Sequence, residues 1–240
     1  MALIAELNEN EKPREKALRY GLRCLSTAEL LALILRTGTK GQSVIETAEQ
    51  LLKKSKGISG IQRMSVNELA SIRGISKVKA VELAACFEIS RRALCETAME
   101  SDVMNSPQEI VRWLQSEIGN ELQEKFMVLY LDTHNRIISW RVLFVGTINQ
   151  SAVYPREIFR EALLCGSTHV ILVHNHPAGD LTPSMNDIAM TQRMMEAGRL
   201  MGVRVLDHLI VTSSGWYSIA AETLDGGMEQ IRKNDIINRR

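Results

Sequence analysis

Two histidines and an aspartate in one short stretch have the residue types and the spacing of metal ligands. In VHNHPAGDLTPSMND (Val173 to Asp187), His174 and His176 stand two positions apart, and Asp187 follows His176 by eleven positions. Neutral imidazoles and a carboxylate bind zinc, and three such ligands leave a fourth coordination position for water, as in catalytic zinc sites. Zinc lowers the pKa of that water to roughly 7, so hydroxide can form at neutral pH.

The surrounding pattern predicts a strand, a loop and a helix that would bring these residues together. THVILVHNH (Thr168 to His176) is typical of a buried strand, where side chains two positions apart point the same way. Pro177 and Gly179 end this strand, and Ser184 is suited to cap a helix with Asp187 in its first turn, facing back toward the strand end. An alternative stays open, because a His-x-His strand needs no metal and the helix dipole alone favours an aspartate there.

The second half of the chain alternates strands and helices, which predicts an α/β domain around a mixed sheet. Helices are expected over 155–166 and 184–200. The other expected strands are KFMVLYLD (Lys125 to Asp132), RIISWRVLFVG (Arg136 to Gly146), VRVLDHLIVT (Val203 to Thr212) and WYSIA (Trp216 to Ala220).

The first half is predicted to be helical, with helices over 13–21, after Ser26, over 44–52, after Ser65 and over 69–94, the last interrupted by a tight turn at Gly74. Small, polar and acidic residues then predict a linker. The next helix is expected to start at Ser106, with Glu109 returning to the cap. The predicted organisation is a helical domain over 1–94, a linker over 95–105, an α/β domain over 106–222 and a polar tail over 223–240.

The motif matches a known signature. His174-x-His176-x7-Ser184-x2-Asp187 corresponds position for position to the metal signature of the JAB1/MPN/JAMM (MPN+) zinc metalloenzymes. The chain from about Pro13 to Ala220 resembles the bacterial RadC family. The motifs that carry this likeness are PREKALRYG, LSTAELLALILRTGT, GISKVKA, VYPREIFREAL, VHNHPAGDLTPSMND and VRVLDHLIV.

This resemblance implies a cytidine-deaminase-like α/β fold and one zinc ion per chain, held by His174, His176 and Asp187. It implies that Glu124 is the general base that moves a proton from water to the leaving amine. Ser184 would stabilise the oxyanion of the tetrahedral intermediate. The implied reaction is hydrolysis of an amide, peptide or isopeptide bond in an unknown peptide or protein substrate.

Two pairs of ionisable residues leave alternatives open. Glu121 lies three positions before Glu124, and Glu124 itself could be a solvated charge at a strand start. Asp207 and His208 could orient a metal ligand as outer hydrogen-bond partners, or they could form a polar pair at a sheet end.

The stretch Ile72 to Ala80 resembles a helix-hairpin-helix, a module that grips the DNA backbone without reading bases. Turn amides at Gly74 and Ser76 and the following helix start would bind phosphate, and Lys77 and Lys79 would add charge. Ser76 replaces the second glycine of the usual Gly-x-Gly, which makes close backbone approach harder. The alternative is an α-hairpin used for packing or protein contact.

These observations leave two main functional hypotheses. The first is a zinc-dependent hydrolase of the JAMM type, and the second is a DNA-binding accessory protein of repair or recombination whose metal site is structural or vestigial. A metal-dependent nuclease is a weaker third. The adjacent letters His-Asn-His do not encode the ββα hairpin of the nucleases that bear that name.

Composition favours an ordinary cytoplasmic protein. Hydrophobic residues make up 45% and charged residues 24%, no apolar run is long enough for a membrane span, and the start lacks a secretory signal. Four separated cysteines without Cys-x-x-Cys argue against thiolate zinc and disulfide scaffolds. Residues 1–100 carry a net charge of +4 and residues 101–240 of −3, which favours an anionic partner for the first half.

Overall fold

The computed structural model describes residues 12–146 and 153–220, and the chain divides into two compact units, Met1–Ser90 and Arg91–Arg240. Each unit is described by itself. The predicted polar tail over 223–240 lies outside the described residues, and the domain boundaries at 94 and 106 stay predictions.

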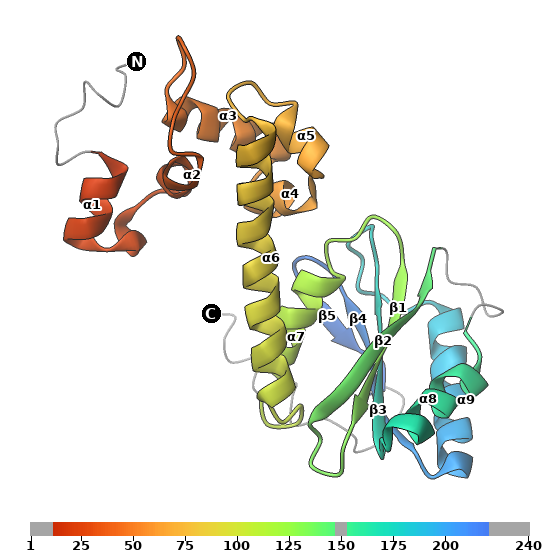
Figure 1. Cartoon of the computed structure of the whole chain (residues 1–240). Coiled ribbons are helices and arrows are strands. Elements are labelled where there is room, and N and C mark those ends of the chain that lie inside the picture. The colour runs from red at the N-terminus through yellow and green to blue at the C-terminus, as the bar shows by residue number, and fades with distance from the viewer. Residues whose placement is uncertain (1–11, 147–152, 221–240) are drawn as a thin grey trace. The chain divides into compact units, whose positions relative to one another are not determined.

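The first unit is helical in its described part (Figure 1). Three of its helices begin at a serine whose hydroxyl accepts from the third helical residue while that residue's glutamate accepts from the serine amide. These capping boxes confirm the helix starts predicted at Ser26 and Ser65. The elements are α1 (Pro13–Tyr20), the 3₁₀ turn η3 (Leu22–Cys24), α2 (Thr27–Leu35), α3 (Val44–Ser55), α4 (Ile58–Arg63), α5 (Val66–Ala70) and the start of α6 (Lys77–Glu100).

The turn between α5 and α6 depends on Gly74. Its φ of +91° lies in the left-handed region, and a Cβ there would meet Thr47 Oγ1 at 2.9 Å. Thr47 is itself buried and donates from its hydroxyl to the Ser43 carbonyl, so it has little freedom to yield. Glycine is therefore required here by backbone conformation and by space, and the predicted tight turn is confirmed.

The predicted end of the helix at Leu94 is wrong, because α6 continues to Glu100 through the first six residues of the predicted linker. The reason is packing: Ala98 is fully buried, and Cys95 and Met99 pack against the core of the second unit. The predicted cap at the next helix is also wrong, because the Ser106 side chain makes no capping hydrogen bond. Glu109 instead accepts a hydrogen bond from the Ser101 hydroxyl.

The second unit contains a five-stranded mixed sheet in the order β2-β1-β3-β4-β5. β1 lies antiparallel to β2 and β3, β3 lies parallel to β4, and β4 lies antiparallel to β5. The elements after α6 are α7 (Pro107–Glu117), β1 (Lys125–Leu131), β2 (Ile137–Val145), α8 (Pro155–Cys165), β3 (His169–Asn175), α9 (Met185–Met201), β4 (Arg204–Val211) and β5 (Trp216–Ser218).

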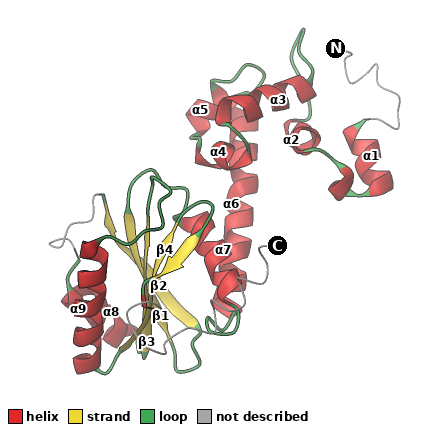
Figure 2. Cartoon of the chain, turned by 180° about the vertical axis from the view of Figure 1, so that it is seen from behind, coloured by secondary structure: helices red, strands yellow, loops and turns green. Residues whose placement is uncertain are grey.

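Helices cover both faces of this sheet, with α7 on one face and α8 and α9 on the other (Figure 2). Side chains alternate between these faces along β1: Met127 and Leu129 join the core under α7, whereas Phe126 and Val128 join the core under α8 and α9. The predicted α/β class with a helical first half is confirmed. Within the described ranges, no helix is both long and apolar enough to cross a membrane.

Candidate metal site

The structure brings His174, His176 and Asp187 together at the end of β3. The Nε2 atoms of the two histidines lie 3.0 Å apart, and Asp187 Oδ1 lies 3.5 Å from His174 Nε2. Asp187 Oδ2 lies 4.0 Å from His176 Nε2. Three atoms bound to one tetrahedral zinc ion at its usual bond lengths are ~3.3 Å from each other. The spacing therefore fits a possible His-His-Asp metal site.

The chemistry of the donor atoms also fits a cation. His176 Nδ1 lies 2.7 Å from the Asp180 carbonyl oxygen, which can only accept a hydrogen bond. A neutral His176 therefore carries its proton on Nδ1, and its Nε2 offers a lone pair toward His174. The side chain of His176 remains 17% exposed while those of His174 and Asp187 are 1% and 8% exposed. Solvent can thus reach the site from the His176 side.

Asp187 belongs to the helix start and to the candidate site at once. Its Oδ2 accepts hydrogen bonds from the Ser184 amide at 2.7 Å and from the Ser184 hydroxyl at 2.6 Å, and its own amide donates to Ser184 Oγ at 3.2 Å. This is a capping box that aims the carboxylate back at the strand end, as predicted. The hydroxyl proton of Ser184 is directed at Asp187, so the predicted oxyanion role requires that hydroxyl to rotate.

Burial favours the neutral forms of His174 and His208. Burial lowers the pKa of His174 to about 4, with Asp187 opposing this shift and His176 adding to it. Complete burial also lowers the pKa of His208 well below its ordinary value, and the two neighbouring histidines act in the same direction. A metal needs neutral imidazole ligands, so His174 is ready to bind one at neutral pH.

The predicted pair Asp207 and His208 divides between the two faces of the sheet. His208 pairs with Leu172, whose side chain lies under α8 and α9, and His208 Nε2 lies 2.8 Å from His174 Nδ1. Asp207 pairs with Ile171, on the face toward α7. Only His208 therefore touches the candidate site.

Asp207 instead anchors the end of the sheet and makes stability depend on pH. Its carboxylate accepts hydrogen bonds from the Ser218 hydroxyl and from the amides of His208 and Ala220. Burial nevertheless raises the pKa of Asp207 to about 6. Because the folded pKa lies above the unfolded value, this group's contribution to stability is complete below about pH 4 and is lost as pH rises through about 6.

His174 and His208, whose pKa values are lowered, act in the opposite direction over this range, so we expect the effect of Asp207 in the difference between two proteins: from pH 4 to pH 7, the free energy of unfolding of the native chain should fall by roughly 2–3 kcal/mol relative to that of Asp207→Asn. Urea unfolding of the two metal-free proteins over this range measures it. Parallel pH profiles for the native chain and the variant would contradict the assignment.

Glu124 directly precedes β1, and the strand register predicts that it lies on the site's side of the sheet. Phe126 pairs with His174 across β1 and β3, so the same register continued by two positions sets Glu124 opposite His176 and on the same face. The competing Glu121 is bound to Lys125, whose Nζ lies 2.7 Å from Glu121 Oε1. The strand register makes Glu124 the acidic residue expected beside the site, and this role stays a prediction.

Sequence reasoning missed Asn175, the residue between the two histidines. Its buried side chain accepts from the Lys125 amide at 2.6 Å and donates to the carbonyls of Gln123 at 3.1 Å and Glu121 at 3.4 Å. Asn175 thus ties the segment around Glu124 to the end of β3. The segment His174-Asn175-His176 lies at the end of β3 in a mixed sheet and does not form the ββα hairpin of the HNH nucleases.

Comparison with known proteins decides the family. Residues 104–224 match the family described as RadC-like JAB domain, and residues 4–81 match the one described as UPF0758 N-terminal. A UPF0758 protein of Listeria monocytogenes serotype 4b is 41% identical over 217 residues, which cover 90% of this chain and 97% of that relative. The chain belongs to the RadC family. A UPF0758 protein of Enterococcus faecalis, 42% identical over 219 residues, covers 91% of this RadC chain and is itself covered to 94%.

The RadC resemblance drawn from the motifs is thereby confirmed, and the RadC-like JAB match covers the possible metal site from β1 to α9. The N-terminal match covers the turn at Gly74. In that turn Ser76 Oγ accepts from the Lys79 amide at 3.3 Å and so caps α6. The Lys79 ammonium donates to the carbonyls of Thr37 at 2.5 Å and Gly74 at 3.2 Å, so it holds the turn together, whereas Lys77 is exposed.

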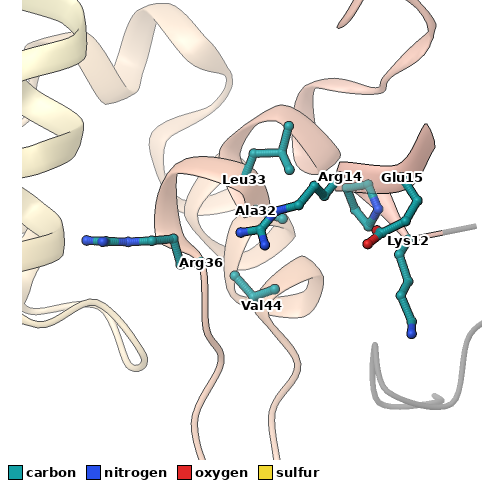
Figure 3. A pocket seen from close by; sticks show the side chains of 8 residues that line it. Lys12, Arg14, Glu15, Ala32, Leu33, Arg36 and Val44 are labelled. Carbon is teal, nitrogen blue, oxygen red and sulfur yellow. The ribbon is translucent and has the colours of Figure 1, made fainter. Parts of the chain in front are cut away.

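The N-terminal unit of this RadC protein also carries a shallow pocket of about 220 Å³ (Figure 3). It is lined by Lys12, Pro13, Arg14, Glu15, Ala32, Leu33, Arg36 and Val44. Arg36 points away from the other labelled side chains and is paired with Glu82. The pocket shares no residue with the candidate metal site, and its basic groups agree in sign with the positive charge of the first half.

Proposed function

We propose that this protein is a zinc-dependent hydrolase of the JAMM type that cuts amide, peptide or isopeptide bonds. One observation carries the proposal: two imidazole nitrogens and a carboxylate oxygen converge within 4.8 Å of one another, beside a solvent-accessible edge. Membership in the RadC family, with its JAB domain, supports the same assignment.

The roles of the residues follow from their positions. His174, His176 and Asp187 would hold zinc, which when bound lowers the pKa of a coordinated water to roughly 7 and polarises the carbonyl to be attacked. Glu124 would accept a proton from the attacking water and deliver it to the leaving nitrogen. Ser184, after turning from Asp187, would donate a hydrogen bond to the oxyanion.

The test begins with metal content and continues with an unbiased substrate search. Purified protein should contain about one zinc per chain, and the zinc-loaded protein should generate new amino termini in a proteome-derived peptide library. His176→Ala should generate none. A protein that binds no transition metal, or that cuts the library equally well after His176→Ala, would refute the proposal.

We further infer a second function, contact with the DNA backbone through the start of α6. Two observations favour it: the turn at Gly74 leads into a helix of 24 residues, and Lys77 is exposed in its first turn. Backbone amides at a helix start attract phosphate, and a lysine adds charge.

Lys77→Glu is therefore expected to weaken DNA binding for all sequences alike and to reduce the salt slope of the affinity by about 1. Fluorescence anisotropy at several salt concentrations measures both. Lys53→Glu on α3 makes the same charge change elsewhere and serves as the control. Lys79 is unsuitable for this test because its ammonium supports the turn. Equal losses for both variants, or binding that ignores salt, would exclude this contact.

A further inference from the structure

A chain of buried hydrogen bonds runs from α9 to the candidate metal site through Thr191, a fully buried residue that the proposed mechanism does not use. Thr191 Oγ1 donates to the Asp187 carbonyl oxygen at 2.6 Å. The same Oγ1 lies 2.6 Å from His208 Nδ1. A hydroxyl has one proton, and the carbonyl can only accept, so His208 Nδ1 must be the donor in the second contact.

The position of the proton on His208 determines the tautomer of His174. A neutral His208 with its proton on Nδ1 has a lone pair on Nε2. His208 Nε2 lies 2.8 Å from His174 Nδ1, so His174 must donate from Nδ1. This leaves the lone pair of His174 on Nε2, the atom that faces His176 Nε2 at 3.0 Å. The tautomers are thus assigned from the hydrogen-bond network.

A competing arrangement of protons would close the site. If the Thr191 hydroxyl turned to donate to His208 Nδ1, then His208 would donate from Nε2 and His174 would carry its proton on Nε2. That proton would point at the lone pair of His176, whose own tautomer is held separately by the Asp180 carbonyl. The two histidines would then bond to each other, and His174 would have no lone pair to offer a metal.

We propose that Thr191 is a positioning residue that, through His208, sets the tautomer of His174 and keeps its Nε2 open for a metal ion. This inference rests on the proposed metal site. The Thr191 hydroxyl donates its single proton to the Asp187 carbonyl, so it cannot also donate to His208 Nδ1. His208 Nδ1 must then be the donor, and this direction of the hydrogen bonds leaves a lone pair on His174 Nε2.

The test compares Thr191→Val with Thr191→Ser. Valine has nearly the same shape without the hydroxyl, so His208 Nδ1–H would lose its only described acceptor and the closed arrangement would prevail. Zinc affinity, measured by competition with a chelator, is expected to fall about 10- to 100-fold, as for other outer partners of metal-binding histidines. Serine retains the hydroxyl and should restore affinity to near the native value.

The tautomers themselves give a second measurement. In metal-free native protein, ¹⁵N NMR of the imidazoles should place the His174 proton on Nδ1, and in Thr191→Val on Nε2. If the native protein already carries the His174 proton on Nε2, or if Thr191→Val binds zinc as tightly as the native chain, the role of Thr191 is refuted. The proposed zinc hydrolase can still stand in that case. If the native tautomers are as assigned but no zinc binds, the proposed function fails, while the control of the His174 tautomer by Thr191 and His208 stands.

Discussion

Replacing His174 by alanine is expected to lower zinc affinity by more than about 100-fold, beyond the loss typical for an outer hydrogen-bond partner of a ligand. His174 is the most buried of the three candidate ligands, and its Nε2 lies closest to both others. Its removal leaves one imidazole and one carboxylate, too few to hold the ion. Metal analysis after dialysis, together with chelator competition, measures the effect.

A matched control lies on the same strand. His169 stands at the opposite end of β3, where its Nδ1 contacts the Asp132 carbonyl oxygen and the Thr168 hydroxyl. His169→Ala should retain about one zinc per chain. Zinc retained by His174→Ala at the native level would show that the ion, if bound, is held elsewhere.

The second large effect is expected from Glu124→Gln, which should reduce hydrolysis about 10²- to 10⁴-fold while zinc stays bound. Glutamine keeps the size of the side chain but cannot accept and deliver the proton. The register of Phe126 with His174, continued by two positions, predicts that Glu124 lies opposite His176, and Glu124 is not required as a ligand in the His-His-Asp set. Initial rates on a peptide found in the library screen, measured beside zinc content, separate the two properties.

Glu121→Gln is the control for this experiment, because Glu121 is bound to Lys125 and lies before the strand. It should keep most of the activity. If Glu121→Gln abolishes hydrolysis and Glu124→Gln does not, the roles of these glutamates are exchanged and the register argument fails.

The fold could be predicted where local signals were strong. The serines at 26, 65 and 184 are each followed three positions later by an acidic residue, and all three form capping boxes. The end of α6 could not be predicted from polarity alone. Residues 95–100 include alanine, methionine and two glutamates, which favour a helix, and contain neither glycine nor proline. The short α4 gave no periodic pattern, and its residues are held by packing around Ile61.

The candidate site shows the same division between local and distant information. The spacing of His174, His176 and Asp187 predicted their convergence because one strand, one loop and one helix position all three. The contact of His174 with His208 depends on the pairing of β3 with β4, which no local pattern specifies. Two signals in the sequence do indicate parts of this arrangement. Alternation along a strand places the adjacent residues Asp207 and His208 on opposite faces of the sheet, and Thr191 follows Asp187 by one helical turn.

The double engagement of Asp187 limits which cations its carboxylate can serve. Oδ2 accepts two hydrogen bonds from Ser184 and lies 4.0 Å from His176 Nε2, whereas Oδ1 lies 3.5 Å from His174 Nε2 and is the better placed oxygen for a metal ion. Hard ions such as Ca²⁺ and Mg²⁺ seek six or more oxygen atoms and would gain little from one oxygen and two nitrogens. Zinc is a borderline-soft ion that takes four ligands, so it would need only one water molecule in addition to the three protein ligands. In the proposed site, the hydrogen bonds at the start of α9 would therefore favour zinc over Ca²⁺ or Mg²⁺.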